Sequence, residues 1–309
     1  MYTADHFRGT AARRRRLLAL FLIGACTVLP ASISSAQTLD RIAQTKRIKL
    51  GVVSGQPPFA FRDAGGKYGG YAVDLCTIVA NEIGKRASAP PIEYVETSLT
   101  DAFDAVATGK VDLLCGAVTA SLSRRETVDF SEPIFATGTT ALLRVNAPLI
   151  FQEFFSGERQ TLPPRSLEMT PFAVLRLGVR DDTTTETALR EAVKKQGYKA
   201  EILVFPAHSE GLAALEGGKI DAYFADRALL VDLQAKARRP SDFVIGKRLF
   251  TREPYAIALR RGDADFRLLI DRALSRFYAT PEFLTLLSRY FGTDAADVRV
   301  QVRALSIGE

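Results

Sequence analysis

The sequence predicts an α/β protein of two lobes, each an open, mainly parallel sheet flanked by helices. Apolar runs of strand length alternate with amphipathic helical patterns from residue 47 to the C-terminus, which is typical of βαβ units. Two such sets follow one another, and both contain an apolar strand preceded by Gly-Lys and Asp, in GKVDLLCG (109–116) and GKIDAYFAD (218–226). The 309 residues are enough for two such sets, each with its own core.

In the first set, apolar runs bounded by turn residues predict buried strands, and apolar residues at helical spacing predict helices between them. The expected strands are IKLGVV (48–53), IEYVET (92–97) and VDLLCGAV (111–118), and the expected helices are YAVDLCTIVANEIGKR (71–86) and LTDAFDAVATG (99–109). Thr100 is the expected N-cap of the second helix and Gly109 its stop. An extended stretch, TTALLRV (139–145), then leads away from this set.

The second set repeats the alternation. Its expected strands are LRLGVR (175–180), AEILVF (200–205), IDAYFAD (220–226) and YAIALRR (255–261), and its expected helices are 185–198, 209–219 and 227–237. Two amphipathic helices, 265–279 and 281–292, are expected to complete the chain. Between the sets, residues 146–171 contain four prolines, which argue against a long helix and leave a surface excursion or a docking surface for a membrane partner as alternatives.

The N-terminus has the pattern of an export signal. Four arginines (13–16) precede the apolar stretch LLALFLIGACTVLPA (17–31), and small residues occupy the −3 and −1 positions before Gln37. We expect residues 1–36 to be cleaved, which leaves a periplasmic protein. Because Ile23-Gly24-Ala25-Cys26 resembles a lipoprotein cleavage box, a form anchored through a lipid on Cys26 is the alternative.

The net charge of +6 is concentrated in this N-terminal segment. Residues 1–36 hold five arginines and one aspartate, so the rest of the chain carries only +2. No basic patch interleaved with aromatic residues follows, and nucleic-acid binding is not expected. The remainder has one histidine, no CxxC motif and no phosphate-binding loop, so neither a metal site nor a cofactor is expected.

After cleavage of the signal, two cysteines remain in an oxidising compartment. Cys76 lies on the expected helix 71–86, and Cys115 lies on the expected strand 111–118. An even number of cysteines in such a compartment permits a disulfide, and two buried, inert thiols are the alternative.

Candidate binding residues follow the expected strands, where ligands of open α/β sheets lie. Thr119 and Arg124 follow one strand, and an arginine with a neighbouring hydroxyl suits a carboxylate, although a solvated loop charge is the alternative. Thr183 and Thr184 precede a helix whose free N–H groups can bind an anion, with an ordinary N-cap as the alternative. Asp226 ends a strand and suits an ammonium group, unless it only caps the next helix.

Together these residues suit the zwitterion of an α-amino acid. His208, by contrast, follows a strand and a proline, and its residue pattern alone indicates a surface histidine.

Six segments, in order, resemble the extracellular solute-binding proteins of family 3, the periplasmic amino-acid receptors of ABC importers, and especially their glutamate/aspartate-binding branch. They are LDRIAQTKRIKLGVV, PPFAFRDAGGKYGGYAVDLC, GKVDLLCGAVTASLSRRETVDFSEPIF, the TTTE at 183–186, HSEGLAALEGGKIDAYFADRALL and EPYAIALRRGD. The resemblance spans about residues 39–292. It implies the two-lobe periplasmic-binding-protein fold of type II, with lobes at 38–143 plus 252–309 and at 144–251, joined by two crossing strands.

The resemblance also implies roles for individual residues. Arg124 and Thr119 match the clamp on the ligand α-carboxylate, and Ala117 matches a position whose backbone contacts the ligand. Thr183 and Thr184 complete carboxylate binding from the second lobe, and Asp226 receives the α-ammonium group. His208 matches a histidine that approaches the ligand side chain.

Several positions depart from the family pattern. Val53 and Ala102 stand where the acidic branch has arginines, and Gln56 and Leu99 replace an aromatic pair that sandwiches basic ligands. Gln56 is therefore kept as an expected ligand-binding residue. Two missing arginines would leave a side-chain carboxylate largely unpaired, at a cost of about 2–5 kcal/mol that His208 and Arg180 compensate at most in part. A polar or modest-sized amino acid is therefore expected in preference to glutamate.

The expected function is that of a monomeric, non-enzymatic receptor that captures an amino acid and delivers it to an ABC permease in the inner membrane. Two alternatives stay open. One is an enzyme on the same fold, similar to cyclohexadienyl dehydratases that act on prephenate or arogenate. The other is a sensing partner of a membrane receptor.

Overall fold

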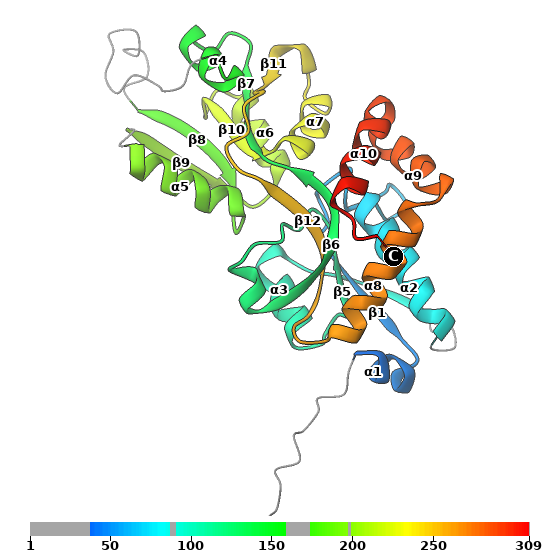
Figure 1. Cartoon of the computed structure of the whole chain (residues 1–309). Coiled ribbons are helices and arrows are strands. Elements are labelled where there is room, and N and C mark those ends of the chain that lie inside the picture. The colour runs from blue at the N-terminus through cyan, green and yellow to red at the C-terminus, as the bar shows by residue number, and fades with distance from the viewer. Residues whose placement is uncertain (1–37, 87–90, 159–173, 197–198, 309) are drawn as a thin grey trace, which may run out of the picture. The chain divides into compact units, whose positions relative to one another are not determined.

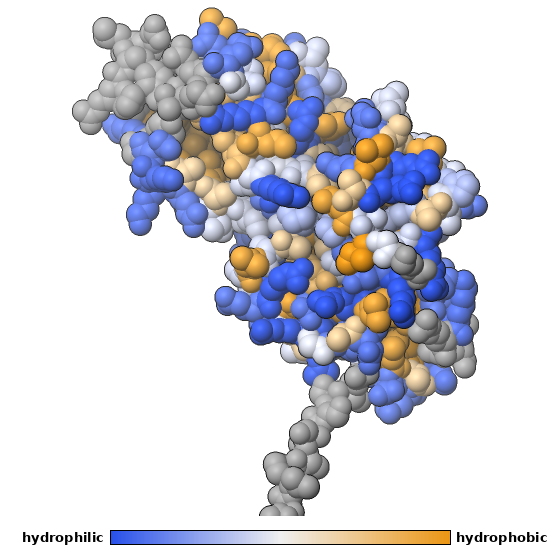
Figure 2. Space-filling model, in the orientation of Figure 1, coloured by the Kyte–Doolittle hydropathy of each residue, from blue (hydrophilic) through white to orange (hydrophobic). Residues whose placement is uncertain are grey.

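Two five-stranded sheets organise the chain in the computed structural model, which describes residues 38–86, 91–158, 174–196 and 199–308 (Figure 1). The predicted export signal, the alternative lipid attachment at Cys26 and residues 159–171 of the proline-containing stretch lie outside these ranges. None of the described helices is long and apolar enough to cross a membrane. Hydrophilic side chains predominate on the face that Figure 2 shows, and apolar ones gather there in small groups.

The first sheet combines strands from both ends of the described chain. Its order is β4 (Ile92–Glu96), β1 (Ile48–Val52), β5 (Leu113–Cys115), β12 (Glu253–Arg260) and β6 (Val128–Thr137). β1 pairs in parallel with β4 and β5, whereas β12 pairs antiparallel with β5 and β6, so the sheet is mixed and not mainly parallel as predicted, because β12 returns from the far end of the chain. A two-stranded hairpin, β2 (Phe61–Arg62) and β3 (Tyr68–Gly69), lies outside both sheets.

Helices cover both faces of this sheet. They are α1 (Thr38–Thr45), α2 (Tyr71–Arg86), α3 (Leu99–Ala107), α8 (Ala264–Tyr278), α9 (Pro281–Phe291) and α10 (Ala295–Leu305). Successive residues of a strand point to opposite faces of the sheet. Leu113 and Ile257 accordingly pack with α2 and α8 on one face, and Leu114 and Ala258 pack with α3 on the other. Strands buried on both faces explain the continuous apolar runs of the sequence.

The second sheet has the order β11 (Phe243–Ile245), β7 (Thr139–Arg144), β10 (Ala222–Asp226), β8 (Leu175–Arg180) and β9 (Ala200–Phe205). It is also mixed, since β8 pairs in parallel with β9 and β10, and β7 pairs antiparallel with β10 and β11. Its helices are α4 (Leu149–Ser156), α5 (Thr184–Gln196), α6 (His208–Glu216) and α7 (Arg227–Ala235). In α4, Phe151 and Phe155 are buried in a core that also includes residues of β7, β8 and β10.

Some expected details are corrected. Ser98, not Thr100, caps α3, because the Ser98 Oγ accepts the Asp101 N–H at 3.1 Å. The strand expected at 111–118 is only β5, since the chain turns away after Cys115. A third C-terminal helix, α10, follows the two that were expected. The chain leaves the first sheet and enters the second at Gly138, because β7 pairs with β10 and β11 of the second sheet. This point precedes residue 143, where the first lobe was expected to end. The lobe boundaries themselves stay a prediction.

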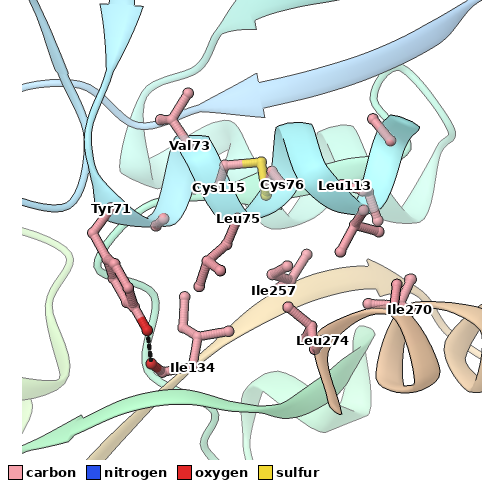
Figure 3. Packing of buried hydrophobic residues seen from close by; sticks show 14 of the residues in the cluster. Tyr71, Val73, Leu75, Cys76, Leu113, Cys115, Ile134, Ile257, Ile270 and Leu274 are labelled. Carbon is pink, nitrogen blue, oxygen red and sulfur yellow. Dashed lines mark hydrogen bonds between the residues drawn. A yellow bond between two sulfur atoms is a disulfide. The ribbon is translucent and has the colours of Figure 1, made fainter. Parts of the chain in front are cut away.

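A disulfide between Cys76 and Cys115 fastens α2 to β5, with the two Cα atoms 6.2 Å apart (Figure 3). The alternative of two free thiols is therefore not what the structure shows. Both cysteines are fully buried among apolar side chains, and the nearby Tyr71 hydroxyl donates to the Ile134 carbonyl at 2.7 Å. Since β5 leads directly to Ala117 and Thr119, the cross-link anchors the strand that carries the first candidate site residues.

The chain passes from the first sheet to the second between β6 and β7, at Gly138. A Cβ atom on Gly138 would lie 2.3 Å from the Thr251 carbonyl oxygen, which belongs to the returning segment. The two segments also share hydrogen bonds, from the Thr139 N–H to the Thr251 Oγ1 at 3.0 Å and from the Phe250 N–H to the Thr139 carbonyl at 2.9 Å. Gly138 thus permits a close approach that a side chain would prevent.

We expect Gly138→Ala to lower the free energy of unfolding by about 1–3 kcal/mol, because the added methyl group forces the two crossing segments apart. Chemical denaturation of the ligand-free protein measures this change. Gly308→Ala is the matched control, since nothing lies within 4 Å of a Cβ there. Equal stability of the two variants would show that the crossing segments separate without cost.

Candidate functional site

A cavity of about 30 Å³ lies where β5, β8 and β10 end, and all eight selected residues line it. They are Gln56, Ala117, Thr119, Arg124, Thr183, Thr184, His208 and Asp226. The first four follow strands of the first sheet, the next three follow strands of the second, and Asp226 is the last residue of β10. The structure therefore brings together residues that are far apart in the sequence, at the strand ends where ligands of α/β sheets lie.

Gln56 supports the loop that follows β5. Its side chain is buried, and its Oε1 accepts the Ala117 N–H at 3.0 Å. The N–H of Ala117 is thus already bonded within the protein. Of the positions that depart from the family pattern, Gln56 and Leu99 line the cavity, whereas Val53 and Ala102 are buried in the core around α3 and do not.

Arg124 is held in place from two sides. Its Nη1 donates to the Thr119 carbonyl at 2.9 Å, and its guanidinium group lies 4.6 Å from the centre of the Phe103 ring. Thr119 itself is buried, and its backbone forms an isolated antiparallel β-bridge with that of Tyr255 in β12. Burial lowers the pKa of Arg124, and the carboxylates of Glu253 and Asp226 oppose this shift. The side chain is therefore a fixed cation at the cavity wall, and the alternative of a solvated loop charge does not apply.

Three threonines mark the start of α5. The Thr183 Oγ1 donates to the Arg180 carbonyl at 2.8 Å and accepts the Glu186 N–H at 3.1 Å, so it caps the helix. The Thr184 Oγ1 donates to Glu253 Oε2 at 2.9 Å, which links the start of α5 to the start of β12. Thr185, which the sequence analysis did not select, also lines the cavity and lies 3.0 Å from Thr139, Oγ1 to Oγ1.

Asp226 is a buried carboxylate between β10 and α7. Its side chain makes no hydrogen bond to the N-terminus of α7, so the alternative of a helix cap is wrong. Instead it accepts the Tyr255 hydroxyl and, at 3.4 Å, the Thr139 hydroxyl. Burial, aided by repulsion from Glu253, raises the pKa of Asp226 to about 7.

His208 is buried, so the surface position that its residue pattern suggested is wrong. It begins α6, and its Nδ1 lies 2.9 Å from the Tyr223 hydroxyl. Burial, together with the positive charge of Arg180, lowers the pKa of His208 to about 3. The imidazole is therefore neutral at physiological pH and offers the cavity a hydrogen-bonding group without charge.

Tyr255 and Glu253, both on β12, belong to the site's support and were not selected from the sequence. Both are buried, and they bond to Asp226 and Thr184 respectively. The signal that could have revealed them is a carboxylate and a tyrosine in an otherwise apolar strand, EPYAIALR.

The arrangement suits a ligand that carries both charges. Arg124 offers a fixed cation for a carboxylate, and Asp226 offers an acceptor for an ammonium group. The start of α5 adds backbone N–H groups and hydroxyls for an anion. Among the described residues, no group of three or more His, Cys, Asp or Glu side chains is placed to hold a metal ion.

A larger cavity, of about 250 Å³, lies in the core around the second sheet. Phenylalanines of α4, β10 and the returning segment line it, among other apolar side chains. It is a separate cavity from the one that holds the charged groups, because among the described residues only Phe224 lines both.

Comparison with known proteins gives the same family. The model of the bacterial extracellular solute-binding proteins, family 3, matches residues 48–293. The L-glutamate/L-aspartate-binding protein of Pseudomonas aeruginosa is 30% identical over 259 residues, which cover 82% of this chain and 80% of the relative. The general L-amino acid-binding periplasmic protein AapJ of Rhizobium johnstonii is 26% identical over 256 residues, covering 81% and 68% of the two chains.

Solved structures share the fold. An ancestral amino acid-binding protein, AncCDT-1, described as a precursor of cyclohexadienyl dehydratase, matches with a TM-score of 0.66 at 26% identity, over 83% of this chain and all of that one. A substrate-binding protein of an ABC uptake transporter from Streptococcus pneumoniae, with bound histidine, matches with a TM-score of 0.70 at 18% identity, over 85% and 99%. The predicted two-lobe α/β fold is thus confirmed, and the chain belongs to the bacterial extracellular solute-binding proteins of family 3.

Proposed function

We propose that this chain is the periplasmic receptor of an ABC importer and binds an amino acid in the cavity between Arg124 and Asp226, which widens beyond its volume of about 30 Å³ to admit the ligand. The relatives that match over most of the chain are named as amino-acid-binding proteins, and one of them as periplasmic. The export signal predicted at residues 1–36 agrees with that compartment. The receptor acts as a monomer and passes its ligand to a membrane permease, without a chemical reaction.

The observation that carries this proposal is the pairing of a fixed cation with a buried carboxylate in one cavity. The α-carboxylate of the ligand binds the guanidinium N–H groups of Arg124 and the start of α5 at Thr183 and Thr184. The α-ammonium group binds Asp226, which the Tyr255 hydroxyl orients. Every α-amino acid carries both groups, so this part of the cavity fixes the class of ligand and leaves the side chain to other residues.

Ligand binding stabilises the contacts that join the two sides of the cavity. Thr184 bonds to Glu253, and Thr100 of α3 donates to Asp182 in the loop before α5. A ligand that bonds Arg124 on one side and Asp226 on the other favours the arrangement in which these contacts form. That arrangement is the form that a permease recognises.

A thermal-shift screen of refolded mature protein tests the proposal. Refolding removes any ligand that was bound during purification, and the screen uses the twenty amino acids, each at 1 mM. A ligand present at 100 times its Kd raises the free energy of unfolding by about 2.7 kcal/mol, which is a clear shift in Tm. We expect the Tm to rise with amino acids of one chemical class and to stay unchanged with the others. If no α-amino acid produces a shift, the receptor proposal is wrong.

The same protein also tests the enzyme alternative, since the solved ancestral protein is described as a precursor of a dehydratase. Incubation with prephenate or arogenate, followed by detection of the dehydrated product, decides for that alternative if product forms. Amino-acid uptake in a strain that lacks the gene separates transport from sensing, because a sensing partner leaves uptake unchanged.

Asp226 makes amino-acid binding dependent on pH. In the ligand-free protein its pKa is about 7, and an ammonium group binds only the ionised carboxylate. Below pH 7, binding must therefore expel a proton, whereas at pH 8 the carboxylate is already ionised. We expect affinity about tenfold lower at pH 6 than at pH 8, with release of one proton per ligand at pH 6. Calorimetry in buffers of different ionisation enthalpy measures both quantities.

Asp226→Asn is the control for this pH dependence. Its amide does not titrate, so the weaker binding that remains should vary little between pH 6 and pH 8. Proton release that persists in Asp226→Asn would assign the titration to another group.

A further inference from the structure

Arg180 is a half-buried cation at the cavity that the amino-acid clamp does not use. It ends β8 and lines the cavity with Thr183 and His208. Its Nε and Nη1 atoms are buried, and in the described part of the chain neither has a hydrogen-bond partner. Buried guanidinium groups are ordinarily paired, because an unpaired one loses its hydration without compensation.

The groups around Arg180 do not supply the missing partner. His208 is neutral, and the Tyr223 hydroxyl is bonded to His208. Asp181 and Asp182 follow Arg180 in the chain and act on it electrostatically, but the Asp182 carboxylate accepts the Thr100 hydroxyl. Burial outweighs these charges and lowers the pKa of Arg180, which agrees with a guanidinium group that lacks a close anion.

The charged side chains that line the cavity point to the missing partner. Of the described residues that line it, Arg124 and Arg180 are the cations and Asp226 is the one carboxylic acid, while the buried Glu253 beside the lining bonds to Thr184. An amino acid with a neutral side chain matches Arg124 and Asp226 and leaves Arg180 unpaired. An amino acid with a second carboxylate also supplies an anion for Arg180.

We propose that Arg180 binds an anionic group on the ligand side chain, so that the cavity selects amino acids with an acidic side chain over their amides. This inference rests on the proposed receptor function. It also reverses the expectation, drawn from the missing arginines at Val53 and Ala102, of a ligand other than glutamate. Those two positions lie in the core around α3, and β8 of the other sheet supplies the positive charge instead.

Pairs of ligands that differ only in charge test this role. Calorimetric titration of refolded mature protein compares aspartate with asparagine and glutamate with glutamine. For at least one pair we expect the acid to bind about 30-fold or more tightly than the amide, the ratio that a buried charge pair provides. In Arg180→Gln the ratio should fall to about one, through weaker binding of the acid, while binding of the amide changes less than about threefold.

Two further variants separate the role of Arg180 from a general effect of positive charge. Arg125→Gln removes a positive charge from an exposed side chain that adjoins Arg124 but does not line the cavity, and it should keep the wild-type ratio. Arg180→Lys retains the charge without the planar group and should keep part of the preference. Melting curves without ligand establish that each variant is folded.

The outcomes separate the inference from the proposed function. If wild-type protein binds amino acids but acids no better than amides, or if Arg180→Gln keeps the wild-type ratio, the role of Arg180 is refuted and the receptor function stands. If no amino acid binds to folded wild-type protein, the receptor function itself fails, and the role of Arg180 with it.

Discussion

Alanine in place of Arg124 is expected to weaken the binding of every amino-acid ligand by about 30-fold or more. Removing one partner of a buried, hydrogen-bonded charge pair costs about 2–5 kcal/mol, because the α-carboxylate of the ligand then lies unpaired in the cavity. Acidic and amide ligands should lose affinity equally, since the α-carboxylate is common to both. This equal loss distinguishes Arg124 from Arg180, whose replacement should affect only the acidic ligands. Calorimetric titration with the ligand found in the screen measures the loss.

Arg125→Ala is the matched control for this prediction. Arg125 adjoins Arg124 in the chain, but its side chain is exposed and does not line the cavity. Its replacement should change affinity by less than about twofold, the range of a screened surface charge.

Arg124→Ala loses its bond to Thr119 and its contact with Phe103, which should lower the free energy of unfolding by only about 1–2 kcal/mol. Wild-type affinity in a folded Arg124→Ala protein would contradict the assignment of the clamp.

Removal of the Cys76–Cys115 disulfide should have the largest effect on stability. The cross-link joins residues 39 positions apart and so lowers the conformational entropy of the unfolded chain. This restriction raises the free energy of unfolding by about 4 kcal/mol, which the variant loses. We expect the double variant Cys76→Ala/Cys115→Ala to unfold at a clearly lower denaturant concentration than the oxidised wild-type protein. Both sites are fully buried, so small cavities add to the loss.

Reduced wild-type protein is the control for the cross-link itself. It retains both sulfur atoms, so its stability relative to oxidised protein isolates the effect of the S–S bond. The double variant should unfold at a slightly lower denaturant concentration than reduced wild type, because it also leaves small cavities. If reduction leaves the unfolding midpoint unchanged, the disulfide does not stabilise the native fold, contrary to this prediction.

The order of the elements could be predicted from the sequence because strands buried on both faces appear as continuous apolar runs. The strands at 175–180 and 200–205 form at the predicted bounds. Other details depend on choices that a single sequence leaves open. Ser98 and Thr100 are both capable of capping α3. Alternation of valine with polar residues at 298–302 follows strand spacing, yet the segment packs as α10 against α9 and β6.

The candidate site was predictable to the extent that strand ends converge, since all eight selected residues line one cavity. Their supporting contacts were not predictable, because each depends on a partner from a distant element. The burial of His208 depends on Tyr223 of β10, and the position of Thr184 depends on Glu253 of β12. Whether Arg180 is paired is likewise a property of the folded chain, since an arginine after a strand has the same sequence pattern in either case.

The position of β12 in the first sheet governs the order in which the chain can fold. The second sheet uses strands from one continuous stretch, β7 to β11, whereas β12 is inserted between β5 and β6, which precede that stretch. Synthesis proceeds from the N-terminus, so β5 and β6 emerge long before the strand that joins them. Until β12 arrives, their unpaired backbone groups are open to other chains. The nascent receptor is thus most vulnerable to aggregation just before its last fifth, which begins with β12, is synthesised.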